Sequence, residues 1–307
     1  MTTPLLFSIQ VDCESTQHAI RDPALGERAT RGLGQLFAET GTKGTFFVIP
    51  GDLAAHPELY RELRGQGHEI GLHVHPAESG HGEFLGVAGP EEQRAILGEA
   101  IDAFASAMGG PPKSFCPGYF SANDATFGIL EELGFTHGAV SCPTRNLPQC
   151  AAVWGPSSLD PRYAHRYNRM LDGGVDFVDL PVTVDPDSRM WGGGQPLDLR
   201  VELVDAKNHF YTIDKAVRRQ LAAGVPVKQL HALTHNIFDY SEPKNFRRET
   251  YAGMVAAARA IAEREKLAFQ GATLAEVAAA YRAAVPFASA APTALRLEAR
   301  GRGFNKA

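Results

Sequence analysis

Short apolar runs typical of β-strands alternate along this chain with longer segments that have the period of amphipathic helices. The predicted strands are Leu5–Val11, Gly44–Ile49, Glu69–Val74, Ser114–Cys116, Gly138–Ser141, Asp176–Val182 and Lys228–Thr234. The predicted helices are Glu27–Glu39, Pro57–Gln66, Pro90–Met108, Asp124–Leu133, Thr212–Ala223, Phe246–Lys266 and Thr273–Arg282. Strands that alternate with helices favour a parallel sheet, so we predict an α/β fold.

The order of these elements favours an incomplete (β/α) barrel in a single domain. The Gly-x-Gly-x-x-Gly pattern of an open dinucleotide-binding sheet does not follow the first strand. The irregular stretches 143–175 and 186–211 are too aromatic for flexible linkers, so we expect insertions over the barrel mouth. The barrel is predicted to span residues 1–285, and residues 286–307 to form a C-terminal extension, loosely attached or packed outside.

The composition is that of an ordinary globular protein: of 307 residues, 44% are hydrophobic and 21% charged, with a formal net charge of −5. The sequence has neither a basic stripe for nucleic acid nor the roughly 18 apolar residues of a membrane span. The sequence shows no N-terminal secretory signal, so we predict a cytoplasmic location, and the four cysteines have no C-x-x-C spacing, which argues against a disulfide scaffold or a structural zinc site. The expected partner is a small-molecule or glycan substrate, not nucleic acid or a membrane; a homo-oligomer stays open.

His73 and His75 close the third predicted strand and are candidate metal ligands. Residues i and i+2 of a strand project from the same face, so both imidazoles can approach one ion. Neutral imidazoles suit zinc and similar divalent metals, and a catalytic zinc site needs two or three such ligands and an open position. Alone, the His-x-His pattern is also compatible with a polar loop that binds nothing.

Other polar residues follow the ends of other predicted strands. Asp12 and Glu14 follow the first strand with the same spacing, Tyr119 follows the fourth, and His235 follows the last. Barrels of this kind place their active sites at the face where the strands end. We therefore expect these residues and the two histidines to meet in one site.

Several ordered stretches also form a recognisable pattern. They are Gly44–Ile49, Pro57–Leu59 followed by Gly67–His73, and Phe115–Tyr119 followed by Leu130–Phe135. Together they resemble the polysaccharide deacetylases, also called the NodB-homology family or carbohydrate esterase family 4. The resemblance covers about residues 5–140 well and is weaker at 233–236 and 272–274. It implies a distorted (β/α)7 barrel and metal-dependent hydrolysis of an N-acetyl group, with Zn²⁺ or a similar divalent ion as cofactor.

The first motif departs from the family pattern. The family usually carries Thr-Phe-Asp-Asp-Gly, whose first Asp is the general base and whose second binds metal; the matching residues here are Gln10–Glu14. The resemblance implies that Asp12 is the base, but Cys13 replaces the metal-binding Asp. Glu14 can supply the carboxylate, Cys13 can bind as a thiolate, or Asp12 can change its role. We favour a carboxylate, from Glu14.

The second and third motifs differ as well. The family's His-(Ser/Thr)-x-x-His places its ligands one helical turn apart, whereas position 77 is Ala and the second imidazole here is His75, with His81 as a weaker alternative. The third motif normally presents an Arg that orients the base, and Cys116 stands in its place. The candidates for replacing that guanidinium, which the sequence does not rank, are Arg145, Arg166 and Arg189.

The expected reaction is metal-assisted amide hydrolysis. A divalent ion on His73, His75 and a carboxylate of the Asp12 and Glu14 pair would polarise the acyl carbonyl and activate water. Asp12 would take the proton of the water. His235 would protonate the leaving amine, because an amide anion is a very poor leaving group.

Three further residues have candidate roles. The backbone N–H of Tyr119 is a candidate for stabilising the oxyanion. Trp191, which is followed by glycines, is a candidate for an aromatic wall of the substrate site. His231 shares a strand face with His235 and is expected inside the barrel rather than on the metal.

Two other functions stay open. Members of the same superfamily hydrolyse cyclic amides such as allantoin, or imides, some of them without a metal. A catalytically silent barrel that only binds a ligand is the other alternative, because two motif residues are changed.

Overall fold

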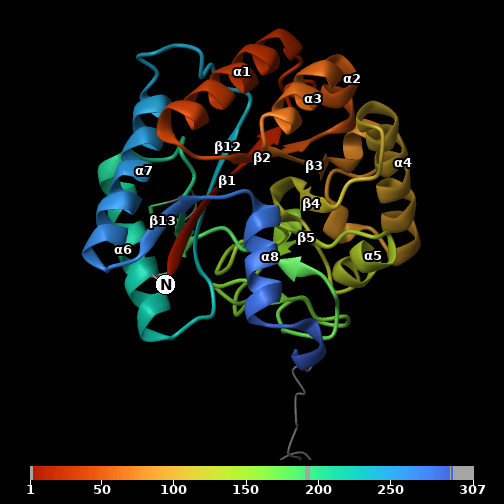
Figure 1. Ribbon diagram of the computed structural model, residues 1–307. Coiled ribbons are helices and arrows are strands. Elements are labelled where there is room, and N and C mark those ends of the chain that lie inside the picture. Colours follow the sequence, from red (N-terminus) through yellow and green to blue (C-terminus); the bar gives the residue numbers. More distant parts are fainter. Residues whose placement is uncertain (1–2, 191–193, 291, 293–307) are drawn as a thin grey trace, which may run out of the picture.

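The computed structural model describes residues 3–190, 194–290 and 292, and it has an α/β architecture in which helices surround a curled sheet (Figure 1). The sheet has nine strands, parallel except for β8 against β9. In spatial order they are β12 (Lys228–His235), β1 (Pro4–Cys13), β2 (Gly44–Val48), β3 (Glu69–Val74), β4 (Ser114–Pro117), β5 (His137–Gly138), β9 (Val178–Asp179) and β8 (Arg162–Tyr163), with β13 (Ala268–Gly271) also on β1.

The helices begin where the sequence carries helix-start signals. They are α1 (Pro23–Thr40), α2 (Pro50–Ala55), α3 (Pro57–Gly65), α4 (Pro90–Met108), α5 (Thr126–Glu132), α6 (Ala206–Ala222), α7 (Phe246–Arg264) and α8 (Leu274–Ala284). Proline occupies the first turn of α1 to α4, and Thr273 opens α8 with a capping box. Short 3₁₀ turns cover Pro76–Ser79, Leu85–Val87, Gly118–Phe120, Pro148–Cys150 and Phe287–Ser289.

Irregular backbone joins the two ends of the curled sheet. After β9, the N–H of Thr183 donates to the carbonyl of His231 on β12 at 3.0 Å. Further along, the N–H of Leu233 donates to the carbonyl of Leu199 at 3.1 Å, and the N–H of Val201 donates to the carbonyl of Leu233 at 3.0 Å. These links complete the ring, so the predicted distorted (β/α) barrel is confirmed.

The carboxyl ends of the parallel strands meet at one end of the barrel. Asp12, near the end of β1, is in register with His235 on β12, and His73 on β3 is in register with Cys116 on β4. Every β1 residue after Pro4 is buried. The packed apolar part of this strand therefore fixes the position of Asp12 and Glu14 at its end. The register therefore sets side chains from four strands around one space.

Most predicted elements agree with the structure to within a few residues, and Glu69–Val74 and Pro90–Met108 have the predicted bounds. The predicted strands Gly138–Ser141 and Asp176–Val182 are wrong in length, because the regular ladder covers only two residues in each of β5 and β9. The sequence analysis missed α2, which is too short to show a period, and β13, whose partly exposed residues show no apolar alternation.

The two long irregular stretches contain short antiparallel pairs. They are β6 (Asn146–Leu147) with β7 (Ala152–Val153), and β10 (Val184–Asp185) with β11 (Leu197–Asp198). Of the expected C-terminal extension, residues 286–290 and 292 are described, and Phe287 packs on Tyr163 with ring centroids 5.1 Å apart. The division at residue 285 stays a prediction. Within the described part of the chain, no helix combines the length and apolar character needed to cross a membrane.

Candidate metal and active site

The strand ends surround a pocket of about 270 Å³ at the mouth of the barrel. Its lining residues are Asp12, Glu14, Gln17, His73, His75, Pro117, Tyr119, Phe120, Arg145, Leu147, Arg200 and His235. Six of the seven candidate site residues from the sequence are in this set. The seventh, Trp191, lies outside the described residues.

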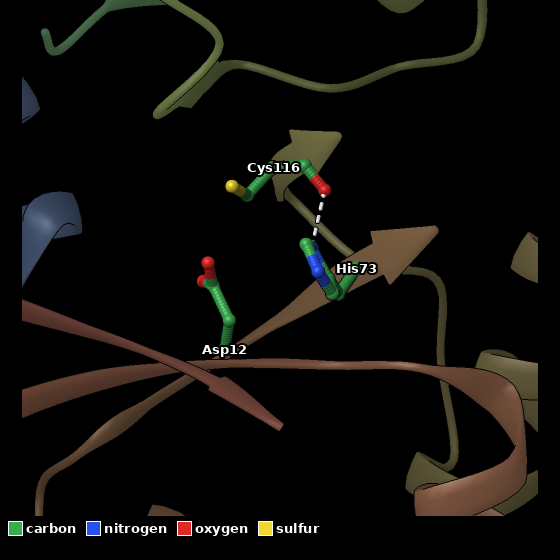
Figure 2. Close-up of side chains that lie close together, drawn as sticks. All are labelled: Asp12, His73 and Cys116. Atoms are coloured by element: carbon green, nitrogen blue, oxygen red, sulfur yellow. Dashed lines mark hydrogen bonds between the residues drawn. The ribbon is translucent and has the colours of Figure 1, made fainter. Parts of the chain in front are cut away.

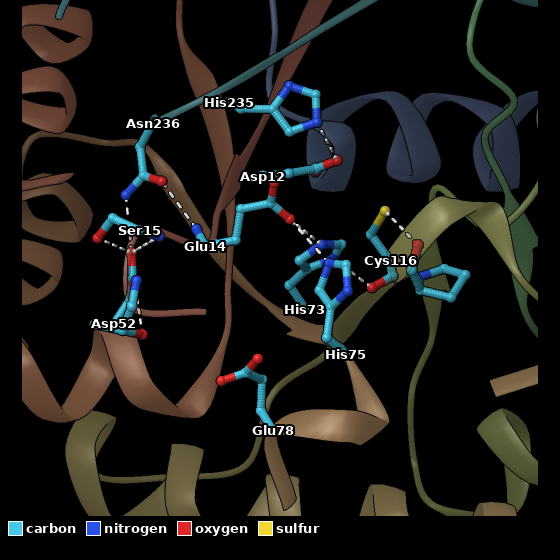
Figure 3. A network of polar contacts seen from close by, with 12 residues as sticks. Asp12, Glu14, Ser15, Asp52, His73, His75, Glu78, Cys116, His235 and Asn236 are labelled. Atoms are coloured by element: carbon cyan, nitrogen blue, oxygen red, sulfur yellow. Dashed lines mark hydrogen bonds and ion pairs between the residues drawn. The ribbon is translucent and has the colours of Figure 1, made fainter. Parts of the chain in front are cut away.

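Glu14, His73 and His75 form a compact group of metal-binding atoms. The Oε2 atom of Glu14 lies 2.9 Å from Nε2 of His75 and 3.5 Å from Nε2 of His73 (Figure 3). Three atoms that bind one tetrahedral ion at about 2.0–2.2 Å lie about 3.3 Å from each other. The spacing in this protein therefore fits a single divalent ion.

Hydrogen bonds position two of these residues. The Nδ1 atom of His73 lies 2.8 Å from the carbonyl oxygen of Cys116 (Figure 2). The other ring nitrogen, Nε2, lies 3.5 Å from Oε2 of Glu14. Metal-binding histidines commonly donate their second ring nitrogen to a carbonyl in this way. The backbone N–H of Glu14 donates to Oδ1 of Asn236 at 2.8 Å, which fixes the end of β1 beside β12.

The Glu14 side chain is ionised in this setting. Burial alone would raise the pKa of Glu14, but hydrogen bonds from His73 and His75 and the charge of His235 outweigh burial and hold that pKa well below its ordinary value. One carboxylate and two imidazoles form a donor set found in catalytic zinc sites. The kinds of donor atom and the distances between them therefore both fit a zinc ion.

The sulfur atoms of Cys13 and Cys116 are poorer candidates for the metal. Burial, followed by the charge of Asp52, raises the pKa of the Cys13 thiol well above its ordinary value, and its Sγ lies 3.7 Å from the carbonyl of Val11. Burial and the charge of Asp12 do the same to Cys116, although Asp12, His73 and Cys116 also lie close together (Figure 2). Within the described residues, an oxygen of Glu14 lies with both imidazoles, whereas the Cys116 sulfur lies with His73 and Asp12 only, so the geometry favours Glu14.

A glutamine orients Asp12 in place of the missing motif arginine. Gln10 lies two residues before Asp12 on β1, and its Nε2 donates to Oδ1 of Asp12 at 2.8 Å. The same Nε2 lies 3.4 Å from Sγ of Cys116, the residue at the motif position. Gln10 was not among the residues predicted from the sequence, although strand alternation places it on the same face as Asp12.

The three arginines considered from sequence lie in different places. Arg145 lines the pocket, where its guanidinium donates to Asp198 at 2.7 Å. Arg166 and Arg189 are not among the lining residues, since Arg166 pairs with Glu131 and Arg189 bonds two carbonyls of its own loop. The alternative metal ligand His81 lies outside the pocket too.

His235 is held by a carboxylate that the sequence analysis missed. Its Nδ1 donates to Oε1 of Glu202 at 2.5 Å, and its Nε2 lies 3.9 Å from Oδ2 of Asp12. Burial lowers the pKa of His235, but the charge and hydrogen bond of Glu202 more than offset burial and raise it to about 9. The imidazole therefore carries a proton at neutral pH.

Glu202 belongs to a short alternating segment that closes the barrel. Asp198, Arg200 and Glu202 alternate with buried Leu199 and Val201, and each of the three polar side chains reaches a group at the pocket. Their spacing puts them on one face of an extended chain. That alternation is the sequence signal that could have identified them within the stretch 186–211.

Asp52 on α2 fixes the chain that follows β1. Its buried carboxylate accepts hydrogen bonds of 2.7–3.0 Å from the backbone and hydroxyl groups of Ser15 and Thr16 and from the amide of Asn236 (Figure 3). Asn236 is the residue that holds the backbone of Glu14. Asp52 thus supports the metal-binding carboxylate without touching it.

Gly118 lets the backbone approach the His75 ring. A Cβ atom at this position would lie 2.6 Å from Cε1 of His75, closer than non-bonded carbon atoms come. The next residue, Tyr119, has φ of 60°, and its ring packs edge-on to His75 with centroids 5.3 Å apart. Burial and the adjacent Glu83 raise the pKa of Tyr119 to about 12, so its hydroxyl stays neutral.

Residues 22–138 match the sequence model of the polysaccharide deacetylase family. The resemblance predicted from the sequence is therefore confirmed, although the match ends before β12 and His235. No match to a curated protein was found.

Solved structures share the fold over nearly the whole chain. A protein from Mycobacterium smegmatis named as a polysaccharide deacetylase has a TM-score of 0.65 at 19% identity, covering 97% of this chain and 96% of its own. One of the same description from Pseudomonas aeruginosa PAO1 has a TM-score of 0.61 at 15% identity, covering 92% of both chains. Puue allantoinase has a TM-score of 0.61 at 16% identity, covering 92% of this chain and 91% of its own. These likenesses establish the barrel fold.

Proposed function

Because residues 22–138 match the polysaccharide deacetylase family and the chain has the fold of such proteins, we propose that this protein is a hydrolase of carbon–nitrogen bonds. It would remove an acetyl or similar acyl group from an N-acylated sugar or a related amide. The observation that carries the proposal is the convergence of Glu14, His73 and His75 beside Asp12 and His235 in one pocket.

Glu14, His73 and His75 would hold a divalent ion, which we propose to be Zn²⁺. Their donor atoms are one carboxylate oxygen and two imidazole nitrogens with the spacing that zinc accepts. When bound, such an ion supplies a Lewis acid that polarises the amide carbonyl and makes water easier to deprotonate.

Asp12 would act as the general base. Its carboxylate lines the pocket and is held in one orientation by Gln10, so it can take the proton of the attacking water. Asp12 is not in the group that Glu14 forms with His73 and His75, so one acid would bind the ion and the other would take the proton.

His235 would act as the general acid. Glu202 keeps its ring protonated and oriented through Nδ1, so Nε2 is the atom that donates to the leaving nitrogen. The backbone N–H of Tyr119 stays our candidate for the oxyanion, and Trp191 our candidate for a wall of the substrate site.

The size of the pocket favours a second candidate substrate class, the small cyclic amides. A volume of about 270 Å³ is just below the range for small-molecule sites, which is about 300–1,000 Å³. Puue allantoinase, whose name refers to such a substrate, has this fold. Allantoin therefore belongs in the first assays beside N-acetylglucosamine.

Metal content and activity should be measured on the same purified protein. We expect about one zinc per chain, hydrolysis of at least one of the two substrates, loss of activity on chelation and recovery on adding zinc. His73→Ala should lose metal and activity, whereas His81→Ala, a histidine outside the pocket, should keep both. Hydrolysis of neither substrate by zinc-loaded protein would contradict the proposed function, and activity that survives both chelation and Asp12→Asn would contradict the proposed metal and base.

A further inference from the structure

Arg200 places a guanidinium in the pocket without an anionic hydrogen-bond partner. Its side chain is 14% exposed, and its Nε lies 3.6 Å from Oδ1 of Asp198, beyond hydrogen-bonding distance. Its only other close polar contact from the guanidinium, within the described residues, is Nη1 to Nε2 of His235 at 3.5 Å. The charges of Asp198, Glu202 and Asp12 lie nearby, but the buried Nε has no hydrogen-bond partner among the described residues, and a ligand anion would supply one.

Arg145 adds a second guanidinium to the same wall of the pocket. It is 5% exposed, stacks over the Phe120 ring at 4.9 Å and donates to Asp198 at 2.7 Å. Asp198 therefore lies beside both arginines and brings their guanidinium groups to the same part of the pocket. Planar guanidinium groups arranged in this way are well suited to a carboxylate, which accepts two parallel hydrogen bonds.

The position of Arg200 indicates where this carboxylate would be on the substrate. His235, which lies 3.5 Å from Arg200, is the residue that would protonate the leaving nitrogen. In an α-amino acid, two carbon atoms separate the nitrogen from the carboxylate oxygens, a span of about 3 Å. A guanidinium beside the proton donor can thus reach an α-carboxylate on the leaving amine.

We propose that Arg200, with Arg145 beside it, binds an α-carboxylate next to the scissile nitrogen, so that the substrates are small N-acylated α-amino acids. This inference rests on the proposed hydrolytic function. Water adds across the amide: the acyl carbon–nitrogen bond breaks, a carbon–oxygen bond forms to the acyl carbon, and the nitrogen receives a proton. The products are a carboxylic acid and an amino acid, and no oxidant or reductant is needed.

Matched pairs of substrates test the carboxylate directly. Zinc-loaded enzyme is assayed with N-acetylglycine, N-acetyl-L-alanine and N-acetyl-L-glutamate and with the α-carboxamide of each, which has the same scissile bond. We expect kcat/KM to be at least about 10-fold higher for the carboxylate form of the best pair. Equal rates for the two forms in every pair, with hydrolysis observed, would overturn the inference and leave the proposed function standing.

Variants of Arg200 separate recognition from general damage to the site. Arg200→Gln should reduce the preference for carboxylate over carboxamide to about one, and Arg200→Lys should retain part of it, because lysine keeps the charge but loses the planar fork. Arg218→Gln, on the exposed surface of α6, is the control and should keep the full preference. An undiminished preference in Arg200→Gln protein of native thermal stability would overturn the role of Arg200.

Binding without turnover distinguishes this inference from the proposed function. In the zinc-loaded Asp12→Asn variant, calorimetry should detect N-acetyl-L-alanine but not its carboxamide, and a further Arg200→Gln change should abolish the binding. If this pattern appears while the native enzyme hydrolyses none of the compounds, the anion site is supported and the proposed hydrolysis is contradicted. Equal binding of the two compounds would contradict the anion site.

Discussion

Glu202 accepts a hydrogen bond of 2.5 Å from Nδ1 of His235, so the carboxylate holds both the proton and the orientation of the ring. Thr234 donates to the other carboxylate oxygen of Glu202 at 3.0 Å, which fixes the acid itself. Burial lowers the pKa of His235, and Glu202 reverses that effect and raises the pKa to about 9. The pair thus provides a proton donor that is charged at neutral pH.

Removing the charge of Glu202 should change the pH dependence of the reaction. The protonated form of His235 is lost as pH rises through about 9 in the native enzyme. In Glu202→Gln the loss should move toward the ordinary histidine pKa of about 6.5. We therefore expect the alkaline limb of kcat/KM to shift to lower pH, with about 10- to 100-fold lower activity at pH 8. An unchanged alkaline limb would contradict the role of His235 as acid.

Loss of the Gln10 amide should reduce turnover without releasing metal. Gln10→Met keeps the side-chain length but removes the donor that holds Asp12. A hydrogen bond to a charged group contributes about 1.5–3 kcal/mol, so kcat should fall about 10- to 100-fold. Zinc content measured on the same protein should stay at the native level. Loss of zinc with unchanged kcat per bound metal would instead place Gln10 in support of the metal ligands.

A methyl group at position 118 should weaken metal binding. In Gly118→Ala the new Cβ would collide with the His75 ring, which must then move away from Glu14. Displacing one of three ligands should raise the Kd for zinc about 10- to 100-fold in a chelator competition titration. Gly155→Ala is the matched control, since a Cβ there meets nothing within 4 Å. Equal zinc affinity of the two variants would contradict this reading of Gly118.

Asp52 should matter for stability as well as for the site. Asp52→Asn places an amide N–H₂ among donors that now bind a carboxylate, so at least one buried hydrogen bond is lost. We expect the free energy of unfolding to fall by about 2–4 kcal/mol in urea titrations. Asp102→Asn, on the exposed face of α4, should change it by less than about 0.5 kcal/mol. A native value for Asp52→Asn would show that the network is not needed for folding.

The part of the site built from strand ends could be predicted from the sequence. Asp12, His73 and His235 each follow an apolar run long enough to identify a strand, and parallel strands bring their ends together. The choice of Glu14 over Cys13 was open in the sequence, because both lie just beyond β1. The structure favours Glu14, because its Oε2 atom lies 2.9 Å from Nε2 of His75 and 3.5 Å from Nε2 of His73, and no sequence pattern contains these distances.

The partners of the remaining site residues could not be predicted. Arg200 and Glu202 lie in a stretch where apolar and polar residues alternate over the seven positions 197–203, which indicates a shared face but not what each side chain contacts. Gln10 could be placed on the Asp12 face, but its hydrogen bond to Asp12 depends on side-chain conformations that the pattern does not contain. Gln10 and Glu202 orient catalytic side chains, and Arg200 is proposed to select the substrate. The contacts of all three depend on tertiary packing.

Zinc-edge anomalous diffraction from crystals grown with one equivalent of Zn²⁺ would locate the ion and identify its ligands. We expect one strong peak within bonding distance of Oε2 of Glu14 and the Nε2 atoms of His73 and His75, with Asp12 outside that distance and free to act as base. A peak held by Asp12, His73 and Cys116, or no peak at these residues in zinc-containing crystals, would contradict the metal site described for this protein.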